Sequence, residues 1–245
     1  MIGSSLGYER SIDRSRLTVP AGEPVFELRY FYPKGQILHY ESQTSMYRTA
    51  DGGPRFTSKS QEELRSRIRL RVLEVEEQDE SAHLVAYHEP LEHTINGAPS
   101  TLAAQRIVYL RQTPCGEVLE TSEPGTVAGL LLPVEPVAVG ARWVERQRQG
   151  VDQRLAPIEV VNHYQILKVE GNLVHIRYEA EEVSFHGDTP ATEGEAYALG
   201  SHGHFDFDAA EGVLVGFHVE SRMAWKGEEY LFEVSSFHSM RLVEA

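Results

Sequence analysis

Two histidines and an aspartate alternate along one short stretch of the chain and have the spacing of metal ligands. His202, His204 and Asp206 are separated by single residues, so on a β-strand they share one face with Cα atoms about 6.5–7 Å apart. Two imidazoles at that spacing can both reach one divalent ion, and a carboxylate can complete the set. The alternative is that Phe205 and Phe207 supply the buried face, which leaves the histidines and the aspartate in water.

Aromatic side chains recur on the apolar faces of the predicted strands. A cleft walled by aromatic and aliphatic side chains is typical of a site for a hydrophobic small molecule, whereas ordinary core packing puts aromatics on the same faces. A loop predicted from Tyr47 to Glu63 would cross the mouth of the cleft, and its glycine, proline and serine content indicates mobility. The candidate ligand-binding residues are Tyr30, Tyr32, Tyr40, Phe217 and Trp225.

Four arginines alternate with apolar residues and form a third candidate. Guanidinium groups suit carboxylates and phosphates, so a row of them predicts a docking site for an anionic ligand or partner. The alternative is a solvated outer face on which the arginines meet glutamates from neighbouring strands, such as Glu74, Glu179 or Glu181. The arginines are Arg65, Arg67, Arg69 and Arg71.

Familiar catalytic signatures are missing from the sequence. It contains no Gly-x-Ser-x-Gly elbow, no Gly-x-x-x-x-Gly-Lys phosphate loop and no His-Glu-x-x-His zinc helix. The adjacent acids Glu181–Glu182 would point to opposite faces of a strand. The single Cys115 excludes an intramolecular disulfide and a multi-cysteine metal site. We therefore expect no cofactor, and the metal face would be the only basis for an enzyme.

The elements that must position these residues are strands. Apolar and polar residues alternate with a period of two through Val25–Tyr32, Leu173–Phe185 and Val213–Trp225, which predicts strands with one buried face. Helical periodicity is confined to three short segments, where one or two short helices are expected. These segments are Gln61–Arg67, Pro99–Gln105 and Pro124–Leu132.

Several patterns occur twice, offset by about 95 to 105 residues, which indicates a duplicated β-unit. Gly35 and Gly140 each open a strand, and Gly116 and Gly212 each sit in a hairpin. Each half has too few strands to close a barrel alone. The sequence therefore predicts an all-β, antiparallel fold: a pseudo-duplicated barrel-like or clam-shaped sheet. The predicted boundaries are a polar arm at 1–23 and one β domain at 24–245, whose halves 24–122 and 134–245 are joined by 123–133.

The joint between the halves resembles a known motif. Leu131 to Trp143 is similar to the LP-x-x-P-V-x-V-G-D-x-W stretch of an uncharacterised bacterial family of duplicated β-meander proteins, with Ala141 in place of the aspartate. The stretch from Phe205 to Val215 resembles that family's F-D-x-x-x-G-x-hydrophobic unit. Such proteins are often exported or lipid-anchored and are reminiscent of the open half-barrels of lipoprotein carriers, which cup acyl chains. The resemblance implies a half-barrel and a hydrophobic ligand, and it assigns no catalytic residue.

Composition limits the class of partner. The chain has 245 residues, a net charge of −14 and a pI near 5.2, and an acidic protein lacks the cationic surface by which most proteins bind nucleic acid. No apolar run is long enough to span a bilayer. The N-terminus lacks the apolar stretch of a secretory signal, which predicts a cytoplasmic protein as the chain is written, or an exported or lipid-anchored one if a leader had been removed.

These observations predict a non-enzymatic scaffold that holds a hydrophobic small molecule or acyl chain in a β cleft. The first alternative is a structural or assembly protein that acts through protein–protein contacts, since unpaired sheet edges can add strands from a partner. The second is a metal-dependent enzyme that uses the His202/His204 face. The oligomeric state is left open.

Overall fold

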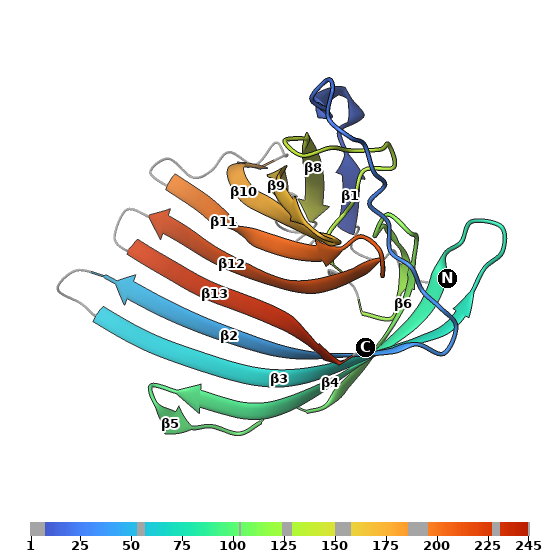
Figure 1. Cartoon of the computed structure of the whole chain (residues 1–245). Helices are drawn as coiled ribbons and strands as arrows, with labels where there is room; N and C mark the ends of the chain where they lie inside the picture. The colour runs from blue at the N-terminus through green and yellow to red at the C-terminus, as the bar shows by residue number, and fades with distance from the viewer. Residues whose placement is uncertain are drawn as a thin grey trace, which may run out of the picture.

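The computed structural model describes residues 8–52, 57–102, 104–123, 129–149, 158–185, 196–226 and 231–244. These residues form one antiparallel sheet of 13 strands, which is open and ends at β1 on one side and β7 on the other (Figure 1). The prediction of an all-β, antiparallel fold is confirmed. Within the described ranges the only helical element is a 3-10 turn, η1 (Arg14–Arg16).

β1 (Tyr8–Ile12) precedes both halves and pairs with β8. The strands of the first half are β2 (Ile37–Asp51), β3 (Thr57–Val75), β4 (Ala82–Ile95), β5 (Ala98–Pro99), β6 (Arg106–Gln112) and β7 (Val118–Thr121). Those of the second half are β8 (Arg142–Gln149), β9 (Ile158–Glu170), β10 (Leu173–Phe185), β11 (Ala196–Asp208), β12 (Val213–Lys226) and β13 (Leu231–Glu244). Their order across the sheet is β1-β8-β9-β10-β11-β12-β13-β2-β3-β4-β6-β7, with β5 paired to β4.

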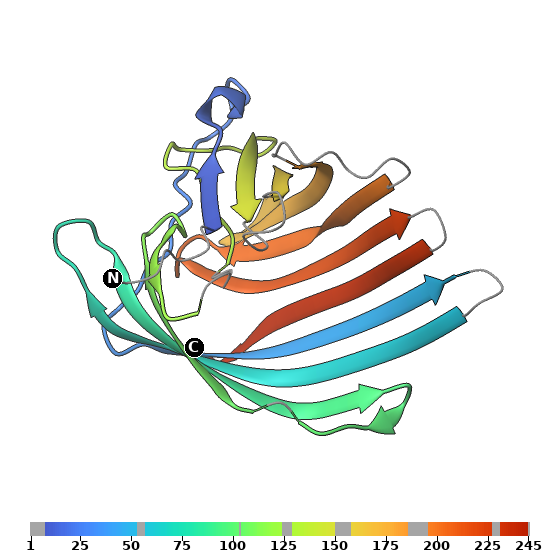
Figure 2. The ribbon, with the colours of Figure 1, turned by 180° about the vertical axis from the view of Figure 1, so that it is seen from behind.

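The sheet consists of two meanders that meet in its middle. The last strand of the chain, β13, pairs with β2, the first long strand, over almost their whole lengths. From that join, the long strands of both halves run side by side (Figure 1), and the view from behind shows the same arrangement (Figure 2). The two halves therefore share one continuous sheet.

The two halves also share local irregularities. Gly35 and Gly140 both have a φ of +84°. Each donates its backbone N–H to the second strand after it, Gly35 to Val72 O on β3 at 3.0 Å and Gly140 to Ile166 O on β9 at 2.9 Å. The pairing of β3 with β4 skips Leu73, and the pairing of β9 with β10 skips Leu167. These matches agree with the repeat seen in the sequence, while descent from a duplication stays a prediction.

The core lies on the face of the sheet that carries Tyr40, Ile68 and Leu70, called the inner face below. Two non-strand segments, 24–34 and 129–141, pack against it at the end where the strands converge. The first segment ties the halves together: Tyr30 N–H donates to Pro114 O at 2.7 Å and Phe31 N–H to Gly212 O at 3.0 Å. The largest cluster of buried side chains includes Leu28, Leu132, Trp143, Ile166, Ile176 and Phe207.

Several sequence expectations about local structure are wrong. The strand expected at Val25–Tyr32 is a non-strand segment with one isolated bridge, from Phe26 to Val137. The predicted helix at Gln61–Arg67 lies within β3, and the predicted loop from Tyr47 to Glu63 is mostly the paired strands β2 and β3. Pairing with β2 on one side and β4 on the other overrides the weak helical pattern. Pro99 begins no helix, since it ends β5. Of Pro124–Leu132, residues 124–128 lie outside the described ranges, and 129–132 are not helical.

Within the described part of the chain, no helix is long and apolar enough to cross a membrane.

Candidate binding cavity and outer groove

An apolar cavity of about 220 Å³ opens on the inner face, under the segment that contains Tyr30 and Tyr32. Its walls come from six strands, and aliphatic side chains form much of them. Among the described residues that line it, none is Asp, Glu, Lys or Arg. The aliphatic residues are Leu38, Ile68, Leu70, Ala86, Leu110, Val213, Leu214 and Met240.

Four of the five aromatic candidates line this one cavity: Tyr30, Tyr32, Tyr40 and Phe217. The Tyr30 ring stacks on Tyr32 with centroids 5.7 Å apart and meets Phe207 edge-on at 5.2 Å. The fifth candidate, Trp225, belongs to β12 opposite Phe232, and its side chain lies outside the described part. The structure thus gathers residues that are far apart in the chain, and whether they bind a ligand stays a prediction.

Tyr30 is fixed by a close approach of the backbone. Its hydroxyl donates to Leu130 O and accepts from Leu130 N–H, each at 3.1 Å. Gly129 makes this possible, because a Cβ there would lie 2.9 Å from the Tyr30 oxygen and its φ is +118°. Burial raises the pKa of Tyr30 well above its usual value, so the hydroxyl stays neutral.

Two histidines that the sequence did not single out also line the cavity. His88 on β4 is half-buried, and His238 on β13 meets Phe217 edge-on at 4.9 Å and lies 3.3 Å from Ser42 Oγ through its Nε2. Loss of water around the rings lowers the pKa of both. Both residues occupy inner-face positions, but the sequence cannot show that β4 and β13 flank the same space.

The lowered histidine pKa values predict a loss of stability in mild acid. Below the ordinary histidine pKa of 6.5, the unfolded chain takes up protons that His88 and His238 resist in the folded state. The free energy of unfolding therefore decreases as the pH is lowered, until the pH drops below the pKa of the folded state. We expect urea unfolding to show that the free energy of unfolding decreases less between about pH 7.5 and 5.5 in the His88→Gln/His238→Gln variant than in the unsubstituted protein. An equal loss in both proteins would contradict this assignment.

The metal candidates lie together on β11 but have separate neighbours. His202 Nε2 is 3.6 Å from a carboxylate oxygen of Glu220, and the His204 ring stacks on His218 with centroids 5.4 Å apart. Asp206 is hydrogen-bonded to His175 Nδ1 at 2.7 Å. Nowhere in the described ranges do three or more His, Cys, Asp or Glu side chains gather as a metal site.

The arginine row faces outward and is largely partnered across strands. Arg65 lies 3.5 Å from Glu92 and Arg67 lies 3.6 Å from Glu89. The Arg69 guanidinium lies over the ring of Tyr87. The partners are therefore residues of β4, rather than the glutamates named from the sequence. Such exposed pairs contribute little to stability.

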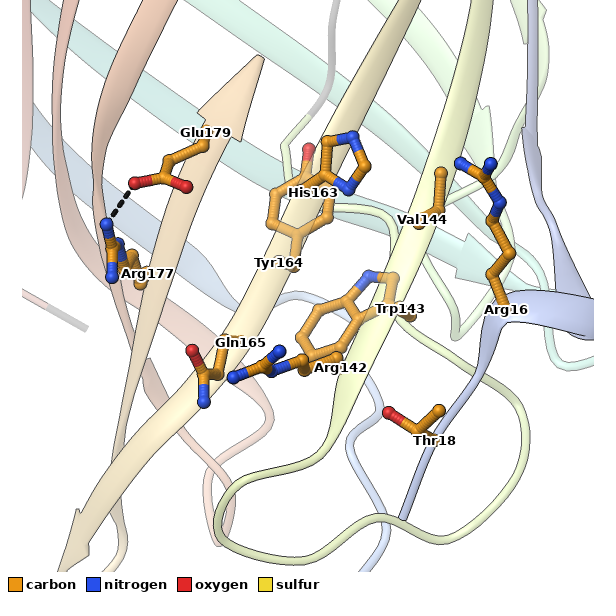
Figure 3. Close-up of a pocket in the computed structure, with 10 residues that line it drawn as sticks. All are labelled: Arg16, Thr18, Arg142, Trp143, Val144, His163, Tyr164, Gln165, Arg177 and Glu179. Atoms are coloured by element: carbon orange, nitrogen blue, oxygen red, sulfur yellow. Dashed lines mark hydrogen bonds and ion pairs between the residues drawn. The ribbon is translucent and has the colours of Figure 1, made fainter. Parts of the chain in front are cut away.

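A groove of about 550 Å³ lies on the outer face of β8, β9 and β10 (Figure 3). Arg142, Gln165 and Arg177 are direct cross-strand neighbours there, a grouping that depends on strand register and has no sequence signal. Arg177 is paired with Glu179, and Arg16 points away from Arg142 beside Val144 (Figure 3). Because the guanidinium groups do not converge, the inner cavity is the better candidate site.

A buried ion pair fixes the first strand beside the core. Arg10 Nε and Nη2 contact the two carboxylate oxygens of Glu145 at 2.5 and 3.0 Å, and Arg10 Nη1 donates to Gly129 O at 3.0 Å. The Tyr164 hydroxyl donates to Glu145 Oε2 at 2.8 Å. The Glu145 side chain is 0% exposed and that of Arg10 is 7% exposed.

No protein-family model matches the chain, and no curated protein is similar to it. The resemblance to duplicated β-meander proteins therefore stays a prediction, and the geometry of the cavity carries the functional argument.

Proposed function

We propose that the protein is a non-enzymatic scaffold that holds a hydrophobic small molecule or acyl chain in the inner-face cavity. The single observation that carries this proposal is the uncharged lining: aromatic and aliphatic side chains surround about 220 Å³ of space in an otherwise acidic protein. Apolar walls with a few polar groups are typical of small-molecule sites.

The size of the cavity limits the ligand. Compounds of drug size need about 300 Å³ or more, whereas an apolar cavity of about 150 Å³ already takes up benzene. At about 220 Å³ the space fits a compact hydrophobe or one end of a longer chain. Outward along β2 and β3 the inner-face residues Ser42 and Ser66 are paired across the strands. Their small side chains leave room for the rest of a long ligand.

The direct test is organic extraction of freshly purified protein followed by mass spectrometry. The proposal predicts a co-purified apolar compound that leaves on extraction and can be replaced by the fluorescent hydrophobe N-phenyl-1-naphthylamine. Absence of any extracted compound, together with no dye binding to the extracted protein, would refute it.

A bulky substitution in the cavity should block the dye. Ile68 is a half-buried residue of the lining, and in the Ile68→Trp variant the larger ring would occupy the space that the dye needs. We expect dye affinity to fall at least about tenfold, which corresponds to about 1.4 kcal/mol, in a fluorescence titration.

The matched control makes the same exchange on the opposite face. Ile107 on β6 is 68% exposed, so Ile107→Trp should leave dye affinity unchanged. Equal loss in both variants would mean that the dye binds elsewhere or that the sheet is disturbed. Circular dichroism of both variants checks that they are folded.

A further inference from the structure

A buried tyrosine of the cavity wall carries a hydroxyl without a hydrogen-bond partner among the described residues. Tyr40 is 5% exposed and lines the cavity, and no described residue hydrogen-bonds to its hydroxyl. This contrasts with Tyr30, whose hydroxyl is satisfied by Leu130. The Tyr40 oxygen is not among the fully buried, unpaired polar atoms of the described residues, so it is accessible from the cavity. A ligand atom that accepts a hydrogen bond from it would gain about 0.5–1.5 kcal/mol.

The hydroxyl of Tyr40 acts as a donor in this position. Burial raises the pKa of Tyr40 well above its usual value, so the group keeps its proton at any physiological pH. The atom that best satisfies it is therefore an oxygen that accepts a hydrogen bond. A second polar group lies two strands away, because His88 on β4 lines the same cavity. Ile68 on β3 pairs with Tyr40 on one side and with His88 on the other.

The absence of cationic side chains among the described residues of the cavity wall indicates an uncharged ligand. No arginine or lysine is among the described residues of the lining, and the local environment favours the neutral form of His88. A carboxylate placed here would lose its water without gaining a cation, which costs several kcal/mol. An ester or ketone oxygen can accept the same hydrogen bond without that cost.

We infer that the ligand is an uncharged hydrophobic molecule that carries a carbonyl oxygen, held by a hydrogen bond from Tyr40. The inference rests on the proposed function and narrows it, since it excludes free fatty-acid anions as the preferred ligands and selects neutral esters and ketones.

The test compares two ligands of equal chain length on the intact protein. Methyl dodecanoate and dodecanoate displace N-phenyl-1-naphthylamine in competition titrations near pH 7.5. The inference predicts that the ester binds at least about tenfold more tightly than the anion. Equal or tighter binding of the anion would overturn it.

Removal of the Tyr40 hydroxyl gives an independent measure. Tyr40→Phe should weaken the ester about fivefold to tenfold, as expected for one hydrogen bond. The control is Tyr47→Phe on the same strand, because Tyr47 is exposed and its hydroxyl lies 3.2 Å from Gln61 Nε2, and it should have no effect.

The two hypotheses fail in different ways. If the dye binds but Tyr40→Phe leaves ester affinity unchanged, the role of Tyr40 is wrong and the binding cavity stands. If neither the dye nor either dodecanoyl compound binds the extracted protein, the proposed function fails and this inference fails with it.

Discussion

Arg10→Met should lower the free energy of unfolding by about 3–5 kcal/mol. The substitution keeps much of the volume of the side chain but leaves the carboxylate of Glu145, which is 0% exposed, without its cation. It also removes a donor from Gly129 O. Urea unfolding followed by tryptophan fluorescence measures the change.

A second variant distinguishes the cost of the unpaired Glu145 charge from the cost of losing the packing contacts of Arg10. Adding Glu145→Gln to Arg10→Met removes the charge, and its amide oxygen can still accept from the Tyr164 hydroxyl, which lies 2.8 Å from Glu145 Oε2. The double variant should therefore recover a large part of the loss. The exposed pair of Arg222 and Glu233, 3.1 Å apart, provides the comparison, because Arg222→Met should cost less than about 1 kcal/mol. Equal effects at the two arginines would contradict the assignment.

Trp143→Ala should have a comparable effect, about 3–5 kcal/mol. Trp143 is 0% exposed and stacks on Tyr164 with ring centroids 5.2 Å apart. Its indole N–H also donates to Leu131 O at 3.1 Å. The truncation leaves a cavity under the segment that closes the core and an unpaired buried carbonyl.

Trp143→Phe divides this effect into two parts. It keeps an aromatic ring against Tyr164 but cannot donate to Leu131 O, so its cost should be near the 1–3 kcal/mol of an unsatisfied buried carbonyl. Ile107→Ala, at a position that is 68% exposed, should change stability by no more than about 0.5 kcal/mol. A loss at Trp143→Ala as small as that at Ile107→Ala would show that the ring is not part of the core. Differential scanning calorimetry gives the ranking of the three variants.

The strands could be predicted because their signal is local. Alternation in Leu173–Phe185 and in Val213–Trp225 corresponds to β10 and β12, and the aromatics on the apolar faces include four that line one cavity. In Gln61–Arg67 a run of polar residues obscures the alternation. The segment is nevertheless part of β3, because it pairs with β2 on one side and β4 on the other. The equally clear alternation in Val25–Tyr32 forms only an isolated bridge at Phe26, so a local pattern gives a strand only where a neighbouring strand pairs with it.

The composition of the site could not be predicted in full, since it depends on register between distant strands. His88 and His238 reach the cavity from β4 and β13, and Arg10 meets Glu145 because β1 pairs with β8. Neither grouping corresponds to a recognisable spacing of residues in the sequence. The outward pairing of Asp206 with His175 likewise became visible only with the β10–β11 register known.

The central seam between β13 and β2 has a consequence for biosynthesis. While the ribosome is still making the second meander, one long edge of β2 has no neighbour, and it is β13, a later strand, that covers this edge. A nascent chain in this condition exposes a template for strand addition. We therefore expect that emergence of β13, rather than emergence of the first half, marks the onset of stable folding.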